Sequence, residues 1–179
     1  MPNIVRLMSP SSLLGAAGEH YVMSQLLRRG LIAALAPVGV PTADIVVTDD
    51  IGDRACAVQV KTRRQLGSDG GWHMKAKHEC IRGASLFYVF LSFPNDVGAL
   101  PDAFVVPSTV VADVLRISHQ TWLARPGRKG QPHKDGEMRR FLPDYSHLDL
   151  ADTYGPAWLE PYRDAWNQLR ADASGGLST

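Results

Sequence analysis

Residues 41–61 read PTADIVVTDDIGDRACAVQVK and decide the fold. Asp44 stands at the head of a short apolar run, a turn rich in Asp and Gly follows, and a second run ends at Lys61. This pattern predicts a β-hairpin that turns near Gly52. Because side chains alternate along a strand, Gln59 and Lys61 share one face and the valines beside Gln59 face a core. A carboxylate, an amide and an ammonium group that converge on a sheet can hold a divalent metal ion and a water molecule against a phosphate.

The register of this hairpin determines whether the three groups meet. A turn near Gly52 pairs residues whose numbers sum to about 104, so Asp44 is expected opposite Val60, to within one residue. Direct opposition to Val60 would place Asp44 on the other face of the sheet. A shift of one residue, or a bulge at Asp44, would place its carboxylate beside Gln59 and Lys61. Both registers stay open at this point.

An acidic residue precedes the hairpin. Apolar spacing predicts a helix from about residue 13 to 29 that contains Glu19. The order of a helix acid, a strand Asp and a strand x-Lys resembles the PD-(D/E)xK nuclease superfamily, which includes many restriction enzymes and the archaeal Holliday-junction resolvases. The resemblance covers about residues 13–110. Gln59 stands where the family has an acidic residue, so the motif is a Gln-x-Lys variant.

The resemblance implies a metal-dependent endonuclease that hydrolyses phosphodiester bonds in DNA, with Mg²⁺ or Mn²⁺ as cofactor. Asp44 would be the central metal ligand, and Glu19 would bind the metal directly or through water. Gln59 would offer its amide oxygen and Val60 its backbone carbonyl. Lys61 would position the attacking water and stabilise the charged transition state. The neutral amide removes one negative charge, which predicts weaker Mg²⁺ binding and a preference for Mn²⁺.

Each residue also has an ordinary structural interpretation. Asp44 can be a turn acid, Lys61 a solvated edge residue, and Glu19 a residue that favours the start of a helix. Two other functions therefore stay open. One is a catalytically silent nuclease-like fold that binds nucleic acid or a protein partner, and metal binding separates it from the enzyme. The other is a structural subunit whose basic loops meet an acidic partner.

Charge is distributed unevenly along the chain. The net charge is only +1, but basic residues cluster in residues 61–82 and 125–140. Clustered cations predict a surface for phosphates, with ordinary solvated loops as the alternative. Trp72 either stacks on a base or packs its loop onto the body. The predicted DNA contacts are Arg63, Arg64, Lys75, Lys77, Arg128 and Lys129.

Length and composition predict one soluble globular domain over residues 1–179, with 45% hydrophobic and 21% charged residues. No apolar run approaches the roughly 18 residues that a membrane helix needs, and the N-terminus has no signal-peptide pattern. We therefore expect a cytoplasmic protein with no membrane partner. Cys56 and Cys80 are isolated and are expected to be free thiols.

The fold class expected is α/β: a restriction-endonuclease-like mixed β-sheet flanked by helices, in the order α-β-β-β-α-β-α. The core should cover about residues 13–116, followed by a basic loop over 125–140 and a C-terminal helix over about 158–170. Cutting both DNA strands usually requires two sites, which favours a homodimer. Trp158, Tyr162 and Trp166 either lie in its interface or pack on the core.

Overall fold

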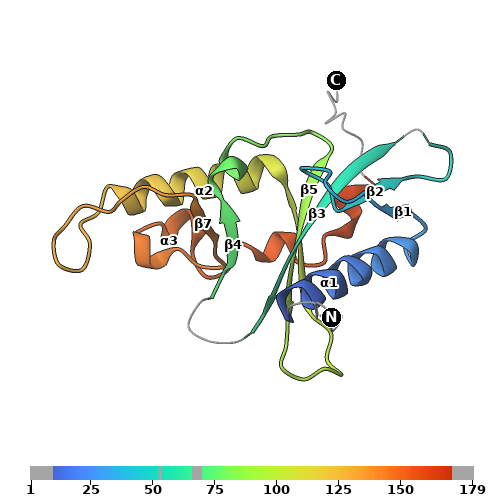
Figure 1. The fold of residues 1–179 in the computed structure, drawn as a ribbon, viewed down its shortest axis with the longest axis horizontal. Coiled ribbons are helices and arrows are strands. Elements are labelled where there is room, and N and C mark those ends of the chain that lie inside the picture. The colour runs from blue at the N-terminus through green and yellow to red at the C-terminus, as the bar shows by residue number, and fades with distance from the viewer. Residues whose placement is uncertain (1–9, 53, 66–69, 171–179) are drawn as a thin grey trace, which may run out of the picture.

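The computed structural model describes residues 10–52, 54–65 and 70–170. A five-stranded sheet with the strand order β1-β2-β3-β5-β6 forms its centre (Figure 1). These strands are β1 (Ile32–Leu35), β2 (Ile45–Thr48), β3 (Ala55–Arg64), β5 (Leu86–Phe93) and β6 (Asp102–Pro107). Only β3 and β5 run parallel, so the sheet is mixed. A smaller antiparallel sheet pairs β4 (Trp72–Lys75) with β7 (Met138–Phe141).

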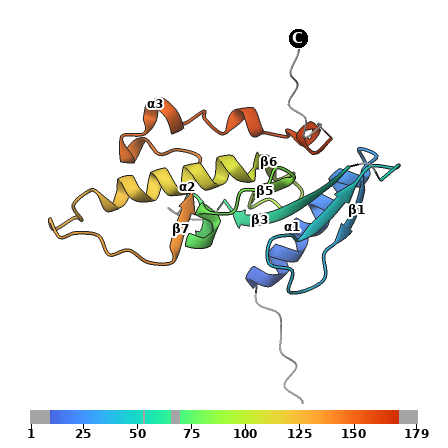
Figure 2. The same ribbon diagram turned by 90° about the horizontal axis from the view of Figure 1, so that it is seen from above.

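Helices flank the central sheet, with α1 (Pro10–Leu27) on one face and α2 (Ser108–Leu123) on the other (Figure 2). The other helical segments are short: η1 (Ala76–Glu79), η2 (Ser146–Leu148), α3 (Ala151–Tyr154), η3 (Glu160–Tyr162) and η4 (Trp166–Leu169). This arrangement confirms the predicted fold class. The expected element order holds from α1 to β5, except that β4 is inserted and the central helix is the single turn η1. None of the described helices is both long and apolar enough to cross a bilayer.

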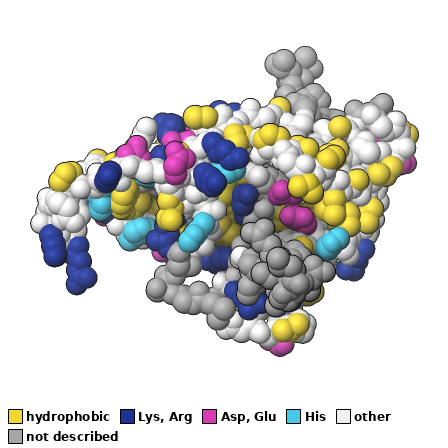
Figure 3. Space-filling model, in the orientation of Figure 1, with side chains coloured by type: hydrophobic (Ala, Val, Ile, Leu, Met, Phe, Trp, Pro, Cys, Tyr) yellow, Lys and Arg dark blue, Asp and Glu magenta, His cyan; other side chains and the backbone are white. Residues whose placement is uncertain are grey.

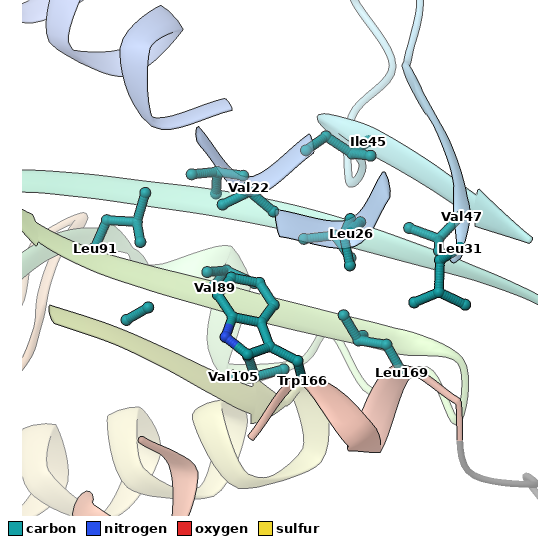
Figure 4. Packing of buried hydrophobic residues seen from close by; sticks show 13 residues of the cluster. Val22, Leu26, Leu31, Ile45, Val47, Val89, Leu91, Val105, Trp166 and Leu169 are labelled. Atoms are coloured by element: carbon teal, nitrogen blue, oxygen red, sulfur yellow. The ribbon is translucent and has the colours of Figure 1, made fainter. Parts of the chain in front are cut away.

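Alternate residues of each strand enter two separate cores. On the first face, Val22 and Leu26 of α1 pack in one core with Val58 and Val60 of β3. Trp166 of η4 belongs to the same core (Figure 4). Burying each such side chain contributes roughly 1.5–3 kcal/mol. On the second face, Phe90 of β5 stacks on Phe141 of β7, with ring centroids 4.0 Å apart, beneath α2. The two-residue repeat of the strands thus produces a three-layer protein.

The second face of the sheet is only half covered. α2 and the β4–β7 sheet lie over β5 and β6. Over β1 and β2 none of the described elements covers the same face, and Ile32 and Val46 are exposed there. The carboxylate and lysine of the sequence motif lie along the border between these halves.

Gly18 brings α1 into direct contact with β3. A Cβ atom at this position would lie 2.2 Å from Oγ1 of Thr62, closer than side-chain packing allows. The absence of a side chain at Gly18 lets the helix approach the strand. The approach places Glu19, the next residue of α1, near the end of β3 that carries Lys61.

The predicted C-terminal helix over 158–170 is wrong. The segment forms the separate turns η3 and η4, and Asp164 between them has a left-handed φ of 48°. Pro161 lies in η3, and a proline cannot donate a helical hydrogen bond. Together the two residues prevent a continuous helix. Trp158, Tyr162 and Trp166 pack on the two cores, which is the second of the alternatives predicted for them.

The predicted basic loop is also too long. Residues 138–140 belong to β7, which pairs with β4. Arg139 is only 6% exposed and forms an ion pair with Glu79. The preceding residues 124–137 do connect α2 to β7 without a strand, and they extend away from the sheet at the left of Figure 1.

Candidate active site

The register of the hairpin brings the three motif residues together. Ile45 pairs with Val58, so the pairing continues to Asp44 opposite Gln59, one residue away from direct opposition to Val60. Ile45 and Val58 both enter the first core. Their neighbours Asp44 and Gln59 therefore lie on the second face, as does Lys61. Of the two registers left open by the sequence, the shifted one is correct.

The backbone of β3 orients the Asp44 carboxylate. The N–H of Val60 donates to Oδ2 of Asp44 over 2.7 Å, and the N–H of Asp44 donates to the Val58 carbonyl over 2.9 Å. These bonds hold the carboxylate against the strand that carries Gln59 and Lys61. An ionised carboxylate has about four acceptor sites, so Asp44 keeps capacity for a metal ion.

The amide oxygen of Gln59 is buried and unpaired. Gln59 is 7% exposed, and its Oε1 is the one buried side-chain nitrogen or oxygen without a hydrogen-bond partner among the described residues. Leaving such an acceptor unsatisfied costs about 1–3 kcal/mol. An amide oxygen is also a ligand that Mg²⁺ accepts. The atom therefore lies where a ligand would relieve its cost.

Charges couple Glu19, Asp44 and Lys61. Burial raises the pKa of the Glu19 carboxyl and the negative charge of Asp44 raises it further, whereas His20 and Lys61 lower it. Burial lowers the pKa of the Lys61 ammonium, which Asp44 opposes and Lys77 reinforces. Two carboxylates that repel each other are stabilised by a cation placed between them. Glu19 thus lies close enough for the charges of Asp44 and Lys61 to act on it, although it comes from the other layer of the protein.

The donor atoms suit a hard divalent cation. Within residues 10–52, 54–65 and 70–170, no three His, Cys, Asp or Glu side chains gather to hold a metal ion. Asp44, Glu19 and Gln59 instead offer two carboxylates and an amide oxygen. Mg²⁺ and Mn²⁺ prefer oxygen ligands, and Mg²⁺ usually keeps several waters. These residues fit such an ion with water completing its shell.

The predicted DNA contacts lie in three places: β4 with η1, the end of β3, and the 124–137 connection. Lys75 and Lys77 are exposed on β4 and η1, and the charges of both act on Lys61. Arg64 is exposed at the end of β3, whereas Arg128 and Lys129 are exposed in the 124–137 connection. Figure 3 shows Lys, Arg and His side chains on the face seen in Figure 1, from the middle of the sheet to the end of this connection.

Arg63 and Trp72 hold each other in place. The Arg63 guanidinium lies over the Trp72 ring, 4.2 Å from its centroid, and its Nε donates to Oγ of Ser92 over 3.0 Å. Trp72 is 2% exposed, and its indole N–H donates to the Leu91 carbonyl. Trp72 therefore packs its segment onto the body, which is the second alternative predicted for it.

The contact between two buried residues near the site, Tyr88 and His78, is not predicted from the sequence. Tyr88 lies opposite Gln59 in the parallel pairing of β3 with β5, and its hydroxyl is 2.7 Å from Nδ1 of His78. Burial lowers the pKa of His78 to about 4, and the charges of Lys61, Lys77 and Lys75 contribute. Tyr88 sits inside an apolar run that reads as core, so its contact with His78 has no signal in the sequence. Cys56 and Cys80 are free, as expected.

Comparisons with known proteins agree with this geometry at the level of the fold. No protein-family profile matches the chain, and no curated protein sequence matches it significantly. A bacterial homing endonuclease, I-Ssp6803I, is similar in structure with a TM-score of 0.51 and 15% identity, over 91% of this chain and 94% of that one. Hjc, a Holliday junction resolvase from Archaeoglobus fulgidus, matches more weakly, with a TM-score of 0.40 and 17% identity over 76% and 88% of the two chains. The likeness to the homing endonuclease shows that the two chains share a fold, the mixed sheet flanked by helices that the sequence predicts for this chain.

Proposed function

We propose that this protein is a metal-dependent endonuclease that hydrolyses phosphodiester bonds in DNA. The observation that carries the proposal is the buried, unpaired Oε1 of Gln59 directly across the hairpin from Asp44. A native protein rarely leaves such an atom unsatisfied, and here it lies beside a carboxylate oriented by the Val60 N–H. The fold likeness to a homing endonuclease is in keeping with DNA as the substrate.

Each residue has a distinct role in this proposal. Asp44, Glu19 and the amide oxygen of Gln59 would hold Mg²⁺ or Mn²⁺, and the Val60 carbonyl is the further ligand expected from the motif. When bound, the ion would polarise the phosphate and acidify a water molecule. Lys61 would orient that water and stabilise negative charge on the phosphate oxygens as they develop it. Burial of Lys61 strengthens this interaction because the local dielectric is low.

The exposed cations would bind the DNA backbone. Lys75 and Lys77 would contact phosphates next to the cleaved bond, and Arg64 those beyond the end of β3. Arg128 and Lys129 would reach a more distant part of the duplex or branched substrate. Arg63 would present one edge of its guanidinium while Trp72 fixes the other side. A second copy of the chain would cut the opposite strand, and the enzyme would act in the cytoplasm.

Metal binding tests this proposal without relying on activity. Calorimetric titration with Mn²⁺ should show binding to the wild type and none to Asp44→Ala. Asp50→Ala removes an exposed carboxylate from the turn of the same hairpin and should bind as the wild type does. Equal binding by all three proteins would contradict the assignment of Asp44 as the metal ligand.

A catalytically silent fold that binds nucleic acid is the second candidate. The observation that favours it is the glutamine at position 59, which leaves Asp44 and Glu19 as the acids of the site. Such a protein would bind DNA equally well with and without Mg²⁺, and Asp44→Ala would leave its binding unchanged. DNA binding that strengthens with Mg²⁺ and weakens in Asp44→Ala would exclude it.

A further inference from the structure

Tyr88, which pairs with Gln59 across β3 and β5, forms a buried pair with His78. In the parallel pairing of β3 with β5, Tyr88 lies opposite Gln59, so both side chains project from the same face of the sheet. Tyr88 is fully buried, and His78 is 3% exposed. The Tyr88 hydroxyl and Nδ1 of His78 are 2.7 Å apart, and their rings meet edge to face.

The hydroxyl proton of Tyr88 is assigned to the contact with His78 from the hydrogen-bond partners around it. Nowhere in the part of the chain that the structure describes does the Tyr88 hydroxyl have a second hydrogen-bond partner. A buried O–H without an acceptor is costly, so Tyr88 donates to Nδ1 and His78 carries its own proton on Nε2. Burial and the nearby Lys61 hold the pKa of His78 at about 4, which keeps the imidazole neutral and Nδ1 able to accept at pH 7.

The same contact explains why the Gln59 oxygen stays unpaired. Oε1 of Gln59 is a buried acceptor without a partner, although a tyrosine hydroxyl lies on the adjacent strand and on the same face. A hydroxyl has one proton to donate, and His78 takes it. If His78 could not accept, the Gln59 amide oxygen would be the one buried side-chain acceptor left unpaired among the described residues, and a rotation of its flexible side chain would let it accept from the Tyr88 hydroxyl on the adjacent strand.

We propose that His78 is a positioning residue that holds the Tyr88 hydroxyl away from Gln59 and so keeps the amide oxygen open for a divalent metal ion. The inference rests on the proposed metal site. It adds the requirement that His78, on η1, accepts the hydrogen bond of the Tyr88 hydroxyl. Gln59 on β3 supplies the metal ligand, and the hydroxyl of Tyr88 on β5 would compete for its oxygen. His78 on η1 prevents this competition by accepting the hydroxyl proton. Lys77 lies on the same turn, so the segment that bears a proposed phosphate contact also maintains the metal ligand.

A double-mutant cycle measured by calorimetric titration with Mn²⁺ tests this role. His78→Leu removes the acceptor, and its Mn²⁺ affinity should fall about fivefold to tenfold, the effect of one competing hydrogen bond. Tyr88→Phe removes the competing hydroxyl and should bind as the wild type does. The double variant should recover the wild-type affinity, because no hydroxyl remains to block Gln59.

Matched variants separate this role from packing. His78→Asn keeps an acceptor near the position of Nδ1 and should retain wild-type affinity. His78→Val is a second acceptor-free variant, with the same expected loss, should the leucine variant fail to fold. If the loss in His78→Leu persists in the double variant, or if His78→Asn loses as much, His78 acts through packing alone and the inference is wrong. A wild-type protein that binds no Mn²⁺ would instead overturn the metal site itself.

Discussion

At the scale of single residues, position 59 sets the charge of the site. In the proposed metal site, an amide there would leave two carboxylates to balance a divalent ion. Gln59→Glu should tighten Mg²⁺ binding by roughly tenfold or more, because it adds a negative charge within contact distance of the ion. Calorimetry measures the change, and Gln120→Glu, on the exposed side of α2, is the control for net charge. Unchanged affinity in Gln59→Glu would mean that this side chain does not contact the metal.

Gly18 offers a residue-scale test of how Glu19 is placed. Gly18→Ala forces a Cβ against Thr62 and should destabilise the fold by about 1–3 kcal/mol in denaturant unfolding. Gly15→Ala lies on the same helix with nothing within 4 Å of the new Cβ, and should stabilise by up to about 1 kcal/mol. Adding Thr62→Ala should restore part of the stability lost in Gly18→Ala. A neutral Gly18→Ala would show that α1 does not need this close approach.

The shared face of Gln59 and Lys61 was predictable from sequence, because local rules determine it. Asp44, Gln59 and Lys61 follow from strand alternation and a tight turn. The exact register of the β2–β3 hairpin could not be predicted from the sequence, because a shift of one residue changes neither the turn composition nor the apolar pattern. Tyr88 and His78 were missed because their contact depends on packing between β5 and η1, which no local pattern encodes.

At the scale of elements, the sequence predicted segments that bury alternating or continuous apolar residues. α1, β2, β3 and β5 are of this kind. β4 and β7 were missed because their pairing joins Trp72 to Phe141, far apart in the chain, within segments rich in Gly, Lys and Arg. The C-terminal segment has a helical apolar spacing, but Pro161 and the left-handed Asp164 interrupt it.

The η1 turn should give the protein a pH-dependent stability. The folded-state pKa of His78 is lowered from 6.5 to about 4. Between these values the unfolded chain binds a proton that the folded chain does not. The contribution of His78 to stability is therefore fully present above pH 6.5 and is lost as the pH drops toward 4, by about 3 kcal/mol in total. Urea unfolding at pH 7 and pH 5 should show this loss in the wild type and a smaller loss in His78→Asn. An equal loss in both would assign the effect to other groups.

At the scale of the whole molecule, two separated groups of cations lie around one face. If both bind DNA, each phosphate contact contributes to the salt dependence of affinity. Removing Arg128 and Lys129 together by alanine substitution should lower the slope of log affinity against log salt by about 1.8, or about 0.9 for each contact. Fluorescence anisotropy with a duplex, at several salt concentrations and with Ca²⁺ in place of Mg²⁺, measures the slope.

The matched control for this experiment removes two arginines that are already paired. Arg82 and Arg116 both form ion pairs with Asp113. Alanine at both positions takes the same charge from the protein and should leave the salt slope within experimental error of the wild type. A slope that falls equally in the two double variants would indicate a general charge effect and no DNA contact by the 124–137 connection.

The central claim is that the protein cleaves DNA at a metal site formed by Asp44, Glu19 and Gln59, with Lys61 orienting the attacking water. The most direct measurement compares wild type with Lys61→Ala on supercoiled plasmid, a four-way junction and single-stranded DNA, with Mg²⁺ or Mn²⁺ present. The wild type should cut at least one of these substrates only when the metal is present, and Lys61→Ala should not cut it. Equal cutting by both proteins, or DNA bound by the wild type and never cut, would contradict the claim.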